Sequence, residues 1–179
     1  MKIHGRRPGA VLSETEIDAV TAFLRSRVGG WVQEKPALRS PPAVSDYVLN
    51  PEGDAPEFAL KDGKYILSED LDRVMREGNR MIILDTRVMS MWQAANIEGS
   101  IPIPYYYQQY DKLVADLPND DTWIFMYCEC PRAAAESVQW ELRDRGFKNT
   151  AVLWEGIQGW AGLGYPVFKG QTAPANTSP

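Results

Sequence analysis

Short apolar runs and amphipathic segments alternate along residues 63–168. The runs that consist almost entirely of apolar residues are 64–67, 81–86, 101–105, 122–128 and 150–154. The segments in which apolar residues recur at helical spacing, or which are short and bounded by turn residues, are 68–78, 89–95, 132–145 and 157–164. Short continuous apolar runs are typical of strands buried on both faces. The pattern therefore predicts an α/β fold, a mostly parallel five-stranded sheet with helices on both faces, with Ser68 capping the helix at 68–78.

An amphipathic helix is predicted before this region, within a segment that we place at residues 1–30. Ser13 and Glu16 form the S-x-x-E pattern of a capping box, in which the two side chains satisfy free amides at a helix start. An apolar stripe at helical spacing follows, made of Ile17, Val20, Leu24 and Val28. Gly29 and Gly30 end the helix. We expect the stripe to pack against another part of a protein.

Two further segments lack a regular pattern. Residues 31–62 are rich in proline and turn residues, which indicates an extended arm or linker. Its aromatic residues Trp31, Tyr47 and Phe58 predict that it packs against the following domain. Residues 169–179 are polar and are expected to be disordered.

Composition narrows the classes of partner and location. The 179 residues carry a net charge of −5, which argues against nucleic acid or an anionic membrane as a partner. No apolar run approaches the roughly 20 residues of a membrane-spanning helix. The start, MKIHGRRPGAVLSE, has basic residues without a following apolar stretch, so it does not resemble a signal peptide. As the chain stands, we expect a cytoplasmic protein.

The two cysteines of the chain, Cys128 and Cys130, lie in the segment YCECPRAAAES at 127–137. Two cysteines cannot form the disulfide framework of a small secreted domain. A structural zinc site needs about four ligands, and the one histidine, His4, is far away in sequence. We therefore predict no metal and no cofactor.

Cys128 lies where the strand 122–128 ends and a helix begins. Pro131 suits the first turn of that helix, where no amide donor is needed. Backbone amides in such a turn and the positive end of the helix dipole favour a thiolate, which lowers the pKa of a cysteine. Arg132 adds a nearby cation. These features point to a nucleophile, although a small buried apolar residue at Cys128 and a bystander at Cys130 remain open at this stage.

From about residue 63 to 168 the chain resembles the rhodanese (sulfurtransferase) domain. Four stretches match the family's landmarks in order: ILDTR at 83–87, MWQAANIEGSIPIP at 91–104, MYCECPR at 126–132 and RGFKNTAVLWEGIQGWAGLGYPV at 145–167. The first is similar to the strand that ends in Asp-x-Arg, the third occupies the active-site loop, and the last matches the closing segment. The resemblance covers the whole predicted domain.

This resemblance implies that Cys128 carries sulfur as a persulfide. Cys128 would take the sulfane sulfur of a donor such as thiosulfate and pass it to cyanide or to a thiol. Arg132 would help to hold the anionic donor, and Asp85 and Arg87 would brace the loop, unless they form only a surface ion pair. The remaining residues of the expected binding loop are Glu129, Cys130, Pro131, Ala133 and Ala134.

The loop departs from the family's usual pattern C-x-x-G-x-R-[ST]. Here it reads C-E-C-P-R-A-A, so Pro131 replaces a glycine and removes one donor amide, and the arginine comes one position early. Glu155 and Gly156 replace the usual paired glycines before the last helix. A C-x-C-P loop resembles that of one subset of rhodanese-like domains. Phosphatases of this fold use C-x5-R, but the matching positions are Ala134 and Glu136, which argues against oxyanion-ester chemistry.

Three roles for Cys130 and two other functions stay open. Cys130 is inert, or it resolves a persulfide or sulfenic acid on Cys128 through a reducible disulfide, or it shares a thiophilic metal with Cys128. A thiol–disulfide redox protein would use both cysteines. A catalytically weak interaction module would bind a protein through the arm and the aromatic run YYYQQY at 105–110, with Tyr105, Tyr106 and Tyr107 as contacts.

The N-terminal helix has a second resemblance. PGAVLSETEIDAVTAFLRS is similar to the last helix of c-type cytochromes, although any capped amphipathic helix would look alike. The chain has no CxxCH motif, so covalent haem is not expected here. If the chain derives from an exported cytochrome fusion, the protein would be periplasmic.

Overall fold

A computed structural model describes residues 13–27, 39–105, 110–129 and 132–169. The chain divides into two compact units, Met1–Pro36 and Ala37–Pro179. In the first unit, helix α1 (Glu14–Arg27) begins with the predicted capping box, in which the Ser13 amide donates to Glu16 Oε2 at 2.9 Å and the Glu16 amide donates to Ser13 Oγ at 3.4 Å. Ile17 and Val20 are about half exposed.

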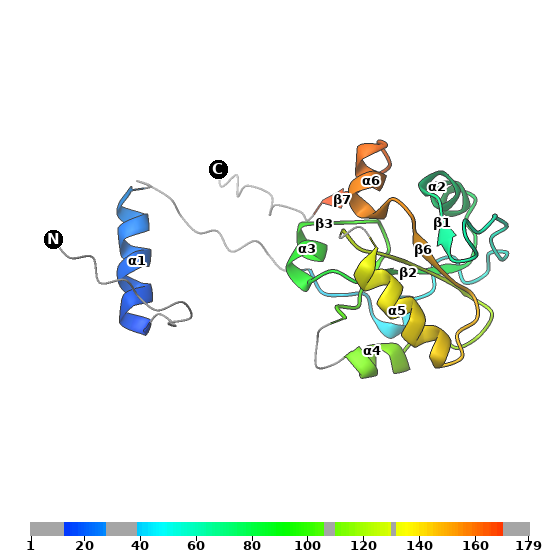
Figure 1. Cartoon of the computed structure of the whole chain (residues 1–179), viewed down its shortest axis with the longest axis horizontal. Coiled ribbons are helices and arrows are strands. Elements are labelled where there is room, and N and C mark those ends of the chain that lie inside the picture. The colour runs from blue at the N-terminus through cyan, green and yellow to red at the C-terminus, as the bar shows by residue number, and fades with distance from the viewer. Residues whose placement is uncertain (1–12, 28–38, 106–109, 130–131, 170–179) are drawn as a thin grey trace, which may run out of the picture. The chain divides into compact units, whose positions relative to one another are not determined.

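The second unit contains the predicted five-stranded sheet, and every strand pair in it is parallel (Figure 1). The strand order is β1-β6-β5-β2-β4. The strands are β1 (Tyr65–Ile66), β2 (Met81–Asp85), β4 (Ile101–Pro102), β5 (Trp123–Tyr127) and β6 (Thr150–Leu153). The predicted α/β fold class is confirmed. Because β2 and β5 are central, their residues are buried from both sides, which explains their continuous apolar sequences.

Helices cover both faces of the sheet. One face packs against α4 (Tyr110–Ala115) and α5 (Ala133–Asp144), and the other against α2 (Ser68–Arg76) and α6 (Gly156–Gly162). Successive strand residues alternate between the two cores: Met126 and Cys128 point toward α5, whereas Tyr127 points toward the opposite core. Helix α4 had not been predicted. No helix in the described ranges is long and apolar enough to cross a membrane.

A small antiparallel sheet lies outside the main one. It pairs β3 (Ala95–Asn96) with β7 (Phe168–Lys169) and follows the short helix α3 (Met89–Ala94). Neither two-residue strand had been predicted, because a pattern of apolar positions needs more residues to become visible. Lys169, assigned above to the tail, is therefore part of this sheet, and the remainder of the predicted tail lies outside the described residues.

Much of the proline-rich arm belongs to the second unit. After a short 3-10 helix η1 (Val44–Asp46), Tyr47 is buried in the core, and Leu49 exchanges two backbone hydrogen bonds with Met81 at the start of β2. The Phe58 ring packs edge-on against Trp123 and Phe125 at 4.7 and 5.3 Å. The third aromatic residue of the arm, Trp31, lies outside the described part of the chain.

Helix α2 is capped differently from the prediction. Ser68 is its first residue, and no side chain at the preceding position caps it. Instead, the Ser68 amide and hydroxyl both donate to Glu155 Oε2, at 2.9 and 2.8 Å. A carboxylate from the turn after β6 therefore satisfies the start of α2 and suits its positive dipole end. The sequence could not indicate this, because the two residues are 87 positions apart.

Candidate active site

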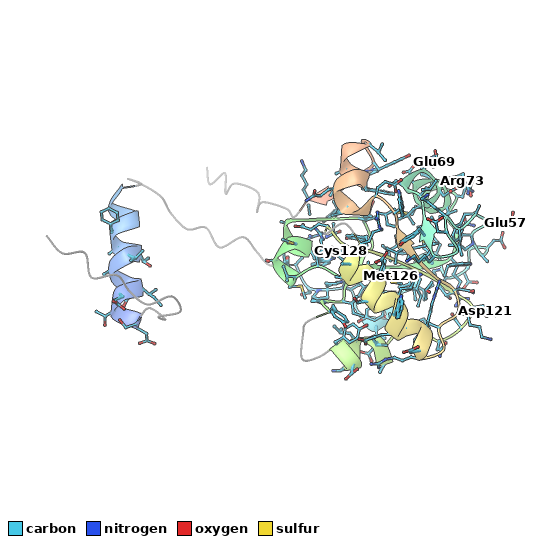
Figure 2. All side chains as sticks on the ribbon, viewed as in Figure 1. Glu57, Glu69, Arg73, Asp121, Met126 and Cys128 are labelled. Atoms are coloured by element: carbon cyan, nitrogen blue, oxygen red, sulfur yellow. The ribbon has the colours of Figure 1, made fainter. Side chains whose placement is uncertain are left out.

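Cys128 directly follows β5 and lies at the carboxyl end of the sheet. Its side chain is only 4% exposed and belongs to the core on the α5 side, and Figure 2 shows it on the side of the domain where α3 and α5 lie. Its backbone carbonyl accepts a hydrogen bond from the Ile157 amide at 3.0 Å, which fastens the strand end to α6. Cys130 and Pro131 lie outside the described residues.

A cavity of about 490 Å3 opens at Cys128. Its walls come from the segments after β2, β4 and β5 and from the first turns of α5, so it lies at the carboxyl ends of parallel strands, where α/β proteins bind ligands. The apolar lining residues are Val88, Met91, Pro104, Ala133 and Ala134. The polar ones besides the cysteine are Thr86, Arg87, Glu129 and Ser137. Among the described residues, the cavity lining is thus mainly apolar, with one cation and one carboxylate.

Arg87 is held in place by a buried network. Its Nη2 and Nε donate to Asp85, with Nη2 at 2.6 Å from Oδ2, and Nη2 also donates to the Ala95 carbonyl. The Tyr127 hydroxyl donates to Asp85 Oδ2 at 2.7 Å and accepts from the Ile97 amide. Asp85 is fully buried and Arg87 is 8% exposed, so the alternative of a surface ion pair is wrong.

The same network sets the protonation states at the site. Burial opposes the charge of Arg87, but the hydrogen bonds and negative charge of Asp85 outweigh it and raise the pKa of Arg87. Burial, reinforced by the charge of Asp85, raises the pKa of Tyr127, so this hydroxyl stays a hydrogen-bond donor. Arg87 is therefore a permanent cation in the cavity wall.

Glu129 places a second carboxylate beside Arg87. Its Oε2 lies 3.7 Å from Arg87 Nη1, and its side chain is about one third exposed. The charge of Arg87 is thus neutralised by two carboxylates. Asp85 lies in the buried network, and Glu129 lies in the cavity wall. The cavity offers much less attraction to a small dianion than an arginine alone would offer.

Arg132 is placed differently from the expectation that it faces a donor. Its Nη1 donates to the Trp154 carbonyl at 2.8 Å, and its guanidinium lies 3.9 Å from the centre of the Trp154 ring. It is not among the described residues that line the Cys128 cavity. Stacking and hydrogen bonding hold it on the residue that follows β6. Arg132 therefore ties the start of α5 to β6, and Arg87 is the cation that lines the cavity.

The remaining expected site residues divide between the cavity and the parts that are not described. Glu129, Ala133 and Ala134 line the cavity. Tyr105 packs edge-on against Tyr110 at 5.6 Å, whereas Tyr106 and Tyr107 lie outside the described ranges. Within those ranges, no three His, Cys, Asp or Glu side chains are grouped to hold a metal ion.

Sequence reasoning missed some residues of the cavity. Thr86 follows the strand residue Asp85 directly, and Met91 and Ser137 lie on α3 and α5. The position of Thr86 at the end of β2 was a usable signal, because side chains at neighbouring strand ends meet at one edge. Ser137, one helical turn beyond Ala133, could have been found from helical spacing.

Several solved structures share this fold. A rhodanese-related protein from Thermoplasma volcanium is 26% identical, with a TM-score of 0.50 over 59% of this chain and 97% of that chain. The rhodanese-like domain of the Alr3790 protein from Anabaena sp. is 20% identical, with a TM-score of 0.53 over 64% of this chain and 85% of that one. A thiosulfate sulfurtransferase from Pseudomonas aeruginosa is 25% identical, with a TM-score of 0.52 over 61% of this chain.

The match to the Pseudomonas enzyme spans only 21% of that chain. No curated protein matches this chain in sequence. A family model described as a rhodanese-like domain matches residues 68–163, more than half of the 179 residues, and these include β2, the strand end at Cys128 and α6. The chain belongs to the rhodanese-like domain family.

Proposed function

We propose that this protein is a sulfurtransferase that carries a sulfane sulfur as a persulfide on Cys128. The observation that carries the proposal is the position of Cys128 in the wall of a cavity at the carboxyl ends of parallel strands, beside the fixed cation Arg87. Membership of a family that includes sulfurtransferases supports the same chemistry. Such a site brings a nucleophile and an incoming sulfur compound together in a mainly apolar cavity.

The reaction has two balanced half-steps. In the first, the Cys128 thiolate attacks the outer sulfur of the donor, an S–S bond forms at Cys128 and the donor's own S–S bond breaks. With thiosulfate the products are the Cys128 persulfide anion and sulfite. In the second, a thiolate or cyanide attacks the terminal sulfur and leaves with it as a persulfide or as thiocyanate, and the Cys128 thiolate is restored.

The cavity favours an organic persulfide or polysulfide over thiosulfate as the donor. Glu129 lies 3.7 Å from the cavity cation Arg87 and repels a dianion. The apolar walls formed by Val88, Met91 and Pro104 suit the carbon chain of an organic donor or acceptor. Thiosulfate turnover is therefore expected to be slow compared with transfer from an organic persulfide.

The test is the intact mass of the reduced full chain after incubation with an organic persulfide and, separately, with thiosulfate. We expect a gain of one sulfur atom that is absent in Cys128→Ser, is retained in Cys130→Ser, and is removed by cyanide. No gain with either donor would rule out the sulfurtransferase. A loss of two hydrogens on mild oxidation, absent in both variants, would instead indicate a redox pair.

A protein-binding module without turnover is the second candidate. The double neutralisation of Arg87 by Asp85 and Glu129 favours it, because it removes the attraction that would draw an anionic donor to Cys128. This candidate predicts that Cys128 takes up no sulfur from any donor. The same mass measurement therefore separates the two functions.

A further inference from the structure

A second hollow adjoins the Cys128 cavity. It has a volume of about 570 Å3 and lies along the outer face of α5, where Lys64 and Tyr105 also line it. We call it the α5 groove. Its lining residues on α5 are Ala133, Glu136, Ser137, Trp140, Glu141 and Asp144. Ala133 and Ser137 line both hollows, so the groove borders the cavity that holds Cys128.

Trp140 is the dominant apolar feature of the α5 groove. Its side chain is 71% exposed, the largest exposure among the large apolar residues described as exposed. A tryptophan gains more than most residues from burial, so an exposed one beside a groove indicates a contact surface. The inward face of α5 already supplies the core through Ala135, Val138 and Leu142, and the fold does not need Trp140.

The α5 groove is also acidic. In the described part of the chain, its walls carry the carboxylates of Glu136, Glu141 and Asp144 and the amine of Lys64. Lys64 lies 3.6 Å from Glu136, and Glu141 lies 3.7 Å from Arg145 on the groove's border. Glu136 also lies 4.0 Å from Arg132, and Arg145 also pairs with Asp111. The four carboxylates of this region, Asp111 included, therefore exceed its three cations by one among the described residues, and the exposed Asp144 is the carboxylate outside these pairs.

We propose that the α5 groove binds a basic segment of a protein that carries the acceptor thiol. An arginine or lysine of that segment would stack on the Trp140 ring and pair with Glu141 or Asp144. This inference rests on the proposed function, because it names the class of acceptor that takes the terminal sulfur from the Cys128 persulfide. A second copy of this chain fits the groove poorly, since its net charge is −5.

The geometry of α5 sets the spacing within the acceptor. Ala133 and Trp140 are seven residues apart on one helix, which corresponds to about 10 Å at 1.5 Å per residue. An extended peptide covers this distance in about three residues at 3.3 Å each. The acceptor cysteine, which must enter the cavity past Ala133, should therefore lie at least about three residues from the basic residue that contacts Trp140.

The experiment uses the full chain loaded with sulfur on Cys128 and two synthetic peptides. One is acetyl-Lys-Arg-Gly-Ala-Cys-Gly-amide, and the other has two glutamates in place of its basic residues. Sulfur transfer to each peptide is followed by mass at low ionic strength. We expect transfer to the basic peptide to be faster by about tenfold or more, since like charges slow association and opposite charges speed it.

Two variants locate the effect. Trp140→Ala should reduce the ratio of the two rates, because it removes the stacking surface and leaves the carboxylates. Glu141→Lys/Asp144→Lys should bring the ratio to one or below, because it makes the groove positive, while transfer to a small uncharged thiol stays unchanged in both variants. The matched control is Glu57→Lys/Asp121→Lys, which makes the same charge change on exposed residues that Figure 2 shows away from Cys128 and should keep the preference. Each variant's urea midpoint checks that it is folded.

Equal rates with the two peptides, or a preference that survives both groove variants, would overturn the inference. If Cys128 takes up no sulfur, the proposed function fails, and the groove is then tested by fluorescence anisotropy with a labelled basic peptide that has serine in place of cysteine. Binding that is weakened about tenfold in Trp140→Ala supports the groove as a docking surface without turnover. Binding equal to that of the acidic peptide overturns it.

Discussion

At the scale of single residues, the proposed function makes the charge around Arg87 the feature that should select the sulfur compounds that react with Cys128. Asp85 lies behind Arg87 and contacts it within the buried network, whereas Glu129 contacts it from the cavity wall. The first carboxylate positions the arginine, and the second reduces its attraction for an anion. The two carboxylates should therefore respond differently to neutralisation.

Glu129→Gln should make thiosulfate a better donor. We expect the rate of Cys128 loading to rise about tenfold, because removing one charge near a dianion changes the barrier by at least about 1.4 kcal/mol at an effective dielectric constant near 20. The rate with an uncharged organic trisulfide serves as the control, since any change in thiolate fraction affects both donors equally. An unchanged ratio of the two rates would show that Glu129 does not select the donor.

Asp85→Asn should mainly reduce stability. The change leaves the buried guanidinium of Arg87 without its counter-charge, and breaking a buried ion pair from one side costs about 3 kcal/mol or more. Urea unfolding measures the loss. Asp121→Asn, at an exposed position, should change the free energy of unfolding by less than about 0.5 kcal/mol. If both variants lose equally little, Arg87 must be hydrated rather than held by Asp85.

At the scale of elements, the contact between Glu155 and α2 joins two helices on one face of the sheet. Glu155→Ala should lower the free energy of unfolding by about 1–2 kcal/mol, the usual cost of losing a helix cap. A double-mutant cycle with Ser68→Ala should give a clear coupling energy, since the Ser68 hydroxyl donates to the same carboxylate oxygen. Additive effects of the two changes would show that the contact does not stabilise α2.

The elements that the sequence reveals are those buried on both faces. Strands β2, β5 and β6 are continuous apolar runs because the sheet encloses them. The pairing of β3 with β7 and the helix α4 leave no comparable pattern, since two residues cannot show a period and α4 directly follows a run of tyrosines and glutamines. Periodicity detects long or enclosed elements and misses short ones at the border.

The site shows a similar division. Cys128 could be proposed as a nucleophile from the sequence because a strand end, a proline and a following helix are all local in sequence. The direction of the Arg132 side chain could not be predicted, because it is set by Trp154, 22 residues later. A long charged side chain can turn to either side of a loop, and only its three-dimensional partners decide between them.

At the scale of the whole molecule, buried tyrosines should control stability at alkaline pH. Burial is the main cause that raises the pKa of Tyr47, Tyr110 and Tyr127. An unfolded tyrosine loses its proton near pH 10, so above that pH the unfolded state binds fewer protons than the folded state. Stability is fully present below about pH 10 and falls as the pH rises, by up to about 1.4 kcal/mol per pH unit for each tyrosine.

Tyr127→Phe tests this dependence. The variant should be less stable at pH 8, because Asp85 and the Ile97 amide lose a buried partner. Its free energy of unfolding should then fall less steeply between pH 10 and 12. Urea unfolding at a series of pH values measures both slopes. Parallel slopes for the variant and the original protein would mean that Tyr127 titrates normally.

Whether the folded domain begins at residue 63 or earlier depends on the packing of the arm before β1. A boundary at residue 63 follows from the sequence pattern, yet Tyr47, Leu49 and Phe58 contribute to the core or to β2. We therefore expect residues 37–179 alone to unfold at the same urea concentration as the full chain. Residues 63–179 should be much less stable, since truncating even one buried aromatic side chain costs about 3–5 kcal/mol.

The comparison needs a variant that separates the arm's packing from its mere length. Tyr47→Ala within residues 37–179 keeps every backbone hydrogen bond of the arm and removes only the buried ring. This variant should show a large part of the stability loss that truncation at residue 63 causes, because domains of this size have only about 5–15 kcal/mol of stability in total. If residues 63–179 are as stable as residues 37–179, the arm is a linker, and the burial of Tyr47 adds nothing to the fold.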